Sequence, residues 1–112
     1  MYEPGLDRHE WEGELQGLEE ELETDPVDAL PELDRLLARM LDEAGYDLRD
    51  PVAREGEERE IVAEYLAAHE TTEAVERGDE GLSLGDVASA INGLRALFDH
   101  LVAERSSADA DL

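Results

Sequence analysis

The stretch VASAINGLRALFDHL, residues 87–101, decides the fold class of this chain. An α-helix has 3.6 residues per turn, so apolar residues that recur at alternating steps of four and three lie on one helical face. The large apolar side chains of this stretch follow that spacing at Val87, Ile91, Leu94, Phe98 and Leu101. Directly upstream, Ser83 and Asp86 match a capping box. We therefore expect a helix over 84–104.

Three more apolar stripes with helical spacing precede this one. They predict helices over 8–24, 26–44 and 51–78, with glycine or proline at most of the boundaries and Asp7 as the cap of the first helix. The third helix could begin at Pro51 or after Gly56. Pro31 lies inside the second helix, so we expect either a separate first turn or a kink there. The stripes consist of Trp11, Leu15, Leu18 and Leu22; of Val27, Leu30, Leu33, Leu37, Met40 and Ala44; and of Ile61, Tyr65, Ala68, Thr72 and Val75.

Four amphipathic helices with short connections pack antiparallel to their neighbours in the sequence. The chain has no sustained two-residue alternation and no hairpin turn signal that would favour strands. These patterns predict an all-α protein, an up-down-up-down four-helix bundle, with a single domain over 1–105. Residues 106–112 offer little to pack against a core, so we expect a flexible C-terminal tail there.

The chain carries 32 acidic and nine basic residues, and its net charge is −23 in 112 residues. Direct binding to nucleic acid depends on cations that neutralise phosphates, so this charge excludes nucleic acid as a partner. It excludes anionic membrane surfaces for the same reason. The sequence contains no cysteine, which removes disulfides and thiolate metal sites.

Hydropathy predicts that the chain is not a membrane protein. No apolar run approaches the ~20 residues of a spanning helix, and the first residues do not resemble a signal peptide. We therefore expect a soluble, cytoplasmic protein.

The sequence lacks the common signatures of catalysis. It has no Ser-His-Asp arrangement, no glycine-rich phosphate loop and no dinucleotide-binding fingerprint. The four apolar stripes contain no carboxylate, which argues against a di-iron bundle. We therefore predict no catalytic residue and no cofactor, and we favour a protein that is not an enzyme.

Two Glu-x-x-Glu pairs, Glu57 with Glu60 and Glu73 with Glu76, loosely resemble the paired acidic motifs of MazG-like nucleotide pyrophosphatases. That resemblance would imply a magnesium site shared by the pairs. The intervening residues are predicted to form one unbroken helix, which would separate the pairs by about 24 Å. A shared metal ion requires a turn between them, so we predict that they are solvated positions of a single helix.

One cluster offers a weak alternative as a metal site. In an up-down-up-down bundle the start of the first helix and the end of the fourth share one end, together with the start of the third. Imidazole and carboxylate groups can hold zinc or a similar ion. The alternative function is therefore a metal-binding protein or metal-dependent hydrolase that uses this cluster, with His9, Glu10, His100 and Glu104 as candidate ligands and Glu57 and Glu58 nearby.

The leading hypothesis is a protein that acts through protein–protein contacts. Several apolar residues lie outside the stripes and are candidates for contact with another chain, because exposed apolar patches mark interfaces. They are Leu36, Leu41, Val62, Leu66, Leu97 and Val102. The partner would be a second copy in a homodimer, or a basic protein for which this chain is an adaptor or inhibitor.

The end of the first helix adds to this hypothesis. Glu19, Glu20, Glu21 and Glu23 lie there, where the helix dipole disfavours negative charge. A cation from a partner would compensate them, and the positive N-terminus of the second helix is the competing explanation.

Overall fold

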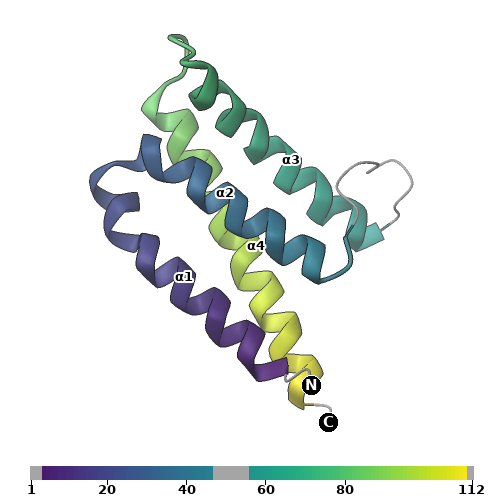
Figure 1. Ribbon diagram of the computed structural model, residues 1–112. Helices are drawn as coiled ribbons and strands as arrows, with labels where there is room; N and C mark the ends of the chain where they lie inside the picture. The colour runs from purple at the N-terminus through teal and green to yellow at the C-terminus, as the bar shows by residue number, and fades with distance from the viewer. Residues whose placement is uncertain (1–3, 47–55, 111–112) are drawn as a thin grey trace.

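The structure, a computed structural model, describes residues 4–46 and 56–110, with side chains over 9–46 and 59–103. This part of the chain forms four helices and no strand: α1 (Pro4–Thr24), α2 (Pro26–Glu43), α3 (Gly56–Arg77) and α4 (Leu84–Ala110). The predicted all-α four-helix bundle is confirmed. Successive helices run in opposite directions in Figure 1.

The start of α1 differs from the sequence prediction. The helix begins at Pro4, earlier than the expected residue 8, so Asp7 lies within the helix and does not cap it. Proline is well tolerated in the first helical turn, because the first N–H groups of a helix have no intrahelical partner.

The described part of α3 starts at Gly56, close to the later of its two predicted starts, and residues 51–55 of the earlier one lie outside the described residues. The end of α4 differs from the expected one. α4 continues through Ala110, beyond the expected residue 104. Residues 106–110, which the sequence predicts to be a flexible tail, are therefore helical, and 111–112 lie outside the described residues. A segment with few apolar residues can still continue a helix, because the helical hydrogen bonds join backbone groups of the same segment.

The helix-end signals of the sequence act as predicted at three positions. The Asp86 N–H donates to Ser83 Oγ over 3.1 Å, and the Ser83 N–H donates to Asp86 Oδ2 over 3.2 Å, which forms the capping box of α4. Gly45 and Gly78 have φ angles of +92° and +70°. At Gly78 the backbone makes the paired hydrogen bonds of a Schellman motif, in which Asp79 N–H reaches the Ala74 carbonyl.

α2 is one continuous helix despite Pro31. Pro31 has no N–H to donate, so α2 lacks one intrahelical hydrogen bond at this position, and the helix continues past it. The Asp25 side chain makes no capping bond, and instead the first turn begins with Pro26.

α2 and α4 form the centre of the bundle. Each of them packs against all three other helices, whereas α1 and α3 lie on opposite sides of this pair. The stripe of α4 is buried completely, and in α1 Leu15 and Leu18 are only half-buried at the edge of the core. Within the described ranges, no helix has both the length and the apolar composition needed to cross a bilayer.

Candidate functional site

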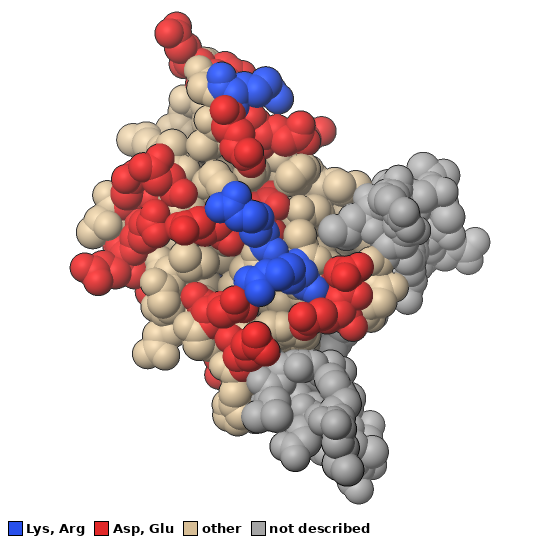
Figure 2. All heavy atoms as spheres, viewed as in Figure 1, with Lys and Arg blue, Asp and Glu red and all other residues tan. Residues whose placement is uncertain are grey.

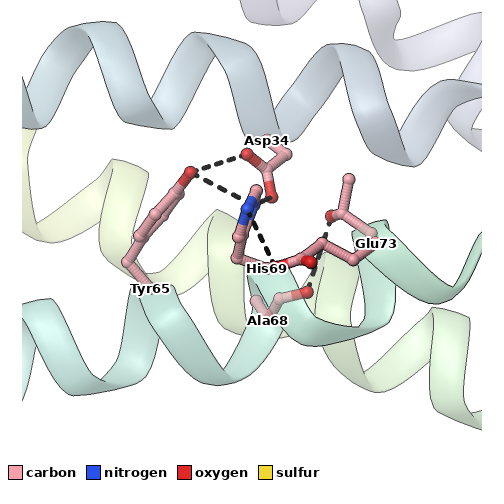
Figure 3. Close-up of polar contacts among 6 residues, drawn as sticks. Asp34, Tyr65, Ala68, His69 and Glu73 are labelled. Atoms are coloured by element: carbon pink, nitrogen blue, oxygen red, sulfur yellow. Dashed lines mark hydrogen bonds and ion pairs between the residues drawn. The ribbon is translucent and has the colours of Figure 1, made fainter. Parts of the chain in front are cut away.

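A buried polar network joins α2 to α3 (Figure 3). The Asp34 side chain lies in the core with only 3% of the residue exposed. Its Oδ1 accepts a hydrogen bond from the Tyr65 hydroxyl over 2.7 Å, and its Oδ2 lies 2.8 Å from Nδ1 of His69. On the other side of the imidazole, Nε2 lies 3.4 Å from Glu73 Oε1. The Tyr65 and His69 rings stack with their centroids 5.5 Å apart.

The paired Asp34 and His69 side chains resemble the orienting half of a catalytic triad, in which a carboxylate fixes the imidazole. A triad then needs a nucleophile at the opposite ring nitrogen. Here Nε2 of His69 faces the carboxylate of Glu73, and the neighbouring Tyr65 hydroxyl already donates its hydrogen bond to Asp34. Among the described residues this network therefore presents no activated nucleophile, and its evident effect is to hold α2 and α3 together.

The Tyr65 hydroxyl is held in its protonated form. Burial raises the pKa of Tyr65, and its hydrogen bond to Asp34 together with the negative charge of that carboxylate raises the pKa further. The hydroxyl is thus a permanent donor at neutral pH, and it satisfies one oxygen of a carboxylate that would be costly to bury alone.

The expectation that no carboxylate enters the core is wrong at Asp34. A signal for its burial exists in the sequence, because Asp34 lies four residues after Leu30 and three before Leu37, on the same face of α2. The spacing of residues along α2 does not show which side chains form hydrogen bonds with the Asp34 carboxylate. Those side chains come from α3, through the tertiary contact between the two helices.

Part of the predicted end-of-bundle metal site lies outside the described side chains, so the site stays a prediction. His9 and Glu10 are exposed on α1, His100 is half-buried on α4, and the Glu104 side chain lies outside those described. The side chains of Glu57 and Glu58 lie outside them too. Among the side chains that the structure describes, no group of three or more potential ligands gathers closely enough to hold an ion.

The two Glu-x-x-Glu pairs lie on a single helix, as expected. α3 runs without interruption from Gly56 to Arg77 and contains both pairs. The turn that a shared magnesium ion requires is therefore absent between them.

Most of the residues expected to contact a partner are in the core of this chain. Leu36, Leu41, Val62 and Leu97 are each 2% exposed or less. These four side chains are therefore covered within one chain, and their role as partner contacts stays a prediction. Leu66 and Val102 remain half-buried and pack against the core.

The exposed apolar surface lies elsewhere, at the start of α4. Leu84 is 73% exposed, and it is the large hydrophobic side chain that the described part of the chain leaves in solvent. It borders an open groove of about 420 Å³ between α4 and the junction of α1 with α2. We call this the Leu84 groove, lined by Leu22, Pro26, Leu84, Ala88, Ile91, Asn92 and Arg95.

Carboxylates cover much of the molecular surface around a few arginines, as the face in Figure 2 shows. Several arginines are already paired with carboxylates of this chain. Arg39 contacts Glu14 over 2.8 Å, and Arg95 contacts Glu19 over 2.7 Å. These pairs leave most of the negative charge without a cation from the same chain.

Carboxylates crowd together where α1 meets α2. A hydrogen bond to Glu32, burial and repulsion from the same carboxylate raise the pKa of Glu21. A hydrogen bond to Asp25 and the charge of that residue likewise raise the pKa of Asp28. We call these four residues, Glu21, Asp25, Asp28 and Glu32, the junction cluster. Two of its members, Glu21 and Asp25, directly precede the groove-lining Leu22 and Pro26 in the chain, whereas Glu32 lines a separate pocket between α1 and α2.

Comparisons of the chain with protein-family models, with curated protein sequences and with solved structures found no match.

Proposed function

We propose that this chain is a non-catalytic binding module that acts through contact with a basic protein. The observation that supports this function most directly is the junction cluster. Its carboxylates have other carboxylates as close neighbours, which raises the pKa of Glu21 and of Asp28. Such mutual repulsion destabilises the isolated chain, and cations supplied by a partner relieve it.

The burial of the surplus apolar residues favours a basic partner over a second copy. An obligate homodimer needs a broad apolar surface, and Leu36, Leu41, Val62 and Leu97 are covered within one chain. A second copy would also bring another charge of −23. A basic protein instead gains from electrostatic steering, which increases association rates.

The test combines light scattering with affinity capture. The immobilised chain is exposed to an extract of the cells that produce it, and bound proteins are eluted with rising salt and identified by mass. We expect a monomer in solution and retention of a basic protein that salt releases, since salt screens exposed charges. A stable dimer, or an eluate identical to that from an unrelated acidic protein on the same resin, would contradict the proposal.

A further inference from the structure

We infer that the Leu84 groove is a docking site for a basic, amphipathic helix of the partner protein. This inference rests on the proposed function and specifies the site and the partner. It is carried by the exposed Leu84 at the start of α4, in a groove whose other side is formed by the end of α1 and the start of α2, where Glu23 and Asp25 are exposed. Helix-in-groove recognition uses apolar anchors on one face of the bound helix and charges on its flanks.

The outer face of α4 has the length that a short helix needs. Leu84, Ala88 and Arg95 all line the groove, at steps of four and seven residues along α4. These positions extend over about 16 Å, which matches a partner helix of roughly three turns. Ala88 and Asn92 are exposed along this face, and Leu84 is 73% exposed at its end. The face is thus open to solvent along its length.

The charges around the groove select the partner's chemistry. Glu23 and Asp25 are exposed, and they adjoin the groove-lining Leu22 and Pro26 in the chain. The one cation of the groove lining, Arg95, is already paired with Glu19 over 2.7 Å. Lysine or arginine side chains flanking a bound helix therefore meet carboxylates, and an acidic segment is repelled.

The start of α4 is a poor site for an anion, because its first turn already carries the Asp86 carboxylate. The N-terminus of a helix binds anions through its free N–H groups. At α4 the Asp86 N–H is donated to Ser83 Oγ, and the Asp86 carboxylate caps the helix in return. A basic helix is therefore favoured over a phosphate or an acidic peptide as the occupant.

The experiment measures binding of a labelled synthetic peptide by fluorescence anisotropy, at about 20 mM and about 150 mM salt. The probe is a helix of leucines at positions i, i+3, i+4 and i+7 with lysines elsewhere. One control peptide has the same composition with the leucines dispersed around the helix, and a second has glutamate in place of lysine. We expect the probe to bind more tightly than either control.

Variants locate the binding. Leu84→Ser should weaken binding of the probe by about tenfold, as expected for an apolar anchor, whereas Leu84→Met should preserve it. Both variants should keep the wild-type melting temperature, because Leu84 is mostly exposed. Glu23→Gln should weaken binding by roughly twofold, and the matched Glu60→Gln on α3 should not, since a single exposed charge contributes little.

The possible failures are distinguishable. If both lysine peptides bind equally and Leu84→Ser has no effect, the groove is not the site, and the proposed acidic function survives. If no lysine peptide binds even at low salt, both proposals fail. A dimer in light scattering that Leu84→Ser converts to a monomer would show that a second copy occupies the groove, and would overturn the basic partner.

Discussion

Two carboxylates on α2, those of Asp34 and Asp28, lie in opposite environments. Asp34 is buried, and its two oxygens contact Tyr65 and His69 at 2.7 and 2.8 Å. Asp28, less than two turns earlier, is exposed, and its pKa is raised by Asp25 and Glu32. A buried carboxylate with partners stabilises a fold, and an exposed one among like charges opposes it. Asp34 therefore maintains the structure, whereas Asp28 and its acidic neighbours are available to a partner.

The largest effect is expected at Asp34. Asp34→Ala removes the acceptor of two hydrogen bonds and leaves the buried Tyr65 hydroxyl with only its long contact of 3.4 Å to His69 Nδ1. We expect the free energy of unfolding to fall by about 2–4 kcal/mol, because hydrogen bonds to a charged group are strong and a poorly bonded buried donor is costly. Urea unfolding followed by circular dichroism measures it.

Asp42→Ala is the matched control for this experiment. Asp42 is an exposed aspartate on the same helix. Its substitution should change the free energy of unfolding by less than about 0.5 kcal/mol. Equal losses of unfolding free energy at the two positions would contradict the prediction, because they would mean that the contacts of Asp34 do not stabilise the fold.

A smaller effect is expected at Tyr65. Tyr65→Phe removes one hydrogen bond and keeps the ring, so the free energy of unfolding should fall by about 1–2 kcal/mol. The pH response follows from the raised pKa of Tyr65, whose ordinary value is 10. Below pH 10 the stabilisation is complete, and it is lost as the pH rises, because the unfolded tyrosine then ionises while the folded one stays protonated.

Absorbance at alkaline pH checks this assignment. Part of the tyrosine signal in the wild type should ionise only well above pH 10, and Tyr65→Phe should remove that late component. A titration curve with the same shape in both proteins would show that the Tyr65 hydroxyl is not held by Asp34.

The smallest effect, with the opposite sign, is expected in the junction cluster. Glu21→Gln removes one of the repelling charges, so the melting temperature at pH 7 should rise. In the wild type the raised pKa of Glu21 means that protonation stabilises the folded state. Stability should therefore increase as the pH falls from 7 towards the ordinary glutamate value of 4.5, and Glu21→Gln should reduce this response.

Glu60→Gln, an exposed position on α3, controls for the loss of one charge from a protein of −23. The gain at Glu21 should exceed the gain at Glu60, and added salt should bring the two closer together. A melting temperature that falls in Glu21→Gln would show that this carboxylate is compensated within the chain.

The sequence predicts the architecture well because helical periodicity is a local property. The stripes of α2, α3 and α4 lead directly to buried residues such as Leu33, Tyr65 and Leu94. The capping box at Ser83 and the glycine at 78 also act locally, and they end or begin helices where expected. The exact starts of α1 and α3 were less predictable, because proline and glycine are compatible with the first turn of a helix.

The candidate site was not predictable to the same extent, because it depends on tertiary contacts. Burial of Asp34 requires His69 and Tyr65 to arrive from α3 at the same level of the bundle. Burial of Leu36 and Leu97 likewise depends on how closely the helices pack. The 73% exposure of Leu84 at the start of α4 is likewise not specified by any periodicity in the sequence.

The most direct test of the account is to map the bound probe on the protein by NMR. Amide shifts of the labelled chain are recorded while the lysine–leucine helix is added. We expect the largest amide shift changes to cluster along the Leu84 groove, at Leu22, Leu84, Ala88 and Asn92. Shift changes spread evenly over exposed carboxylates of all four helices would contradict this expectation, because they would show binding by charge alone.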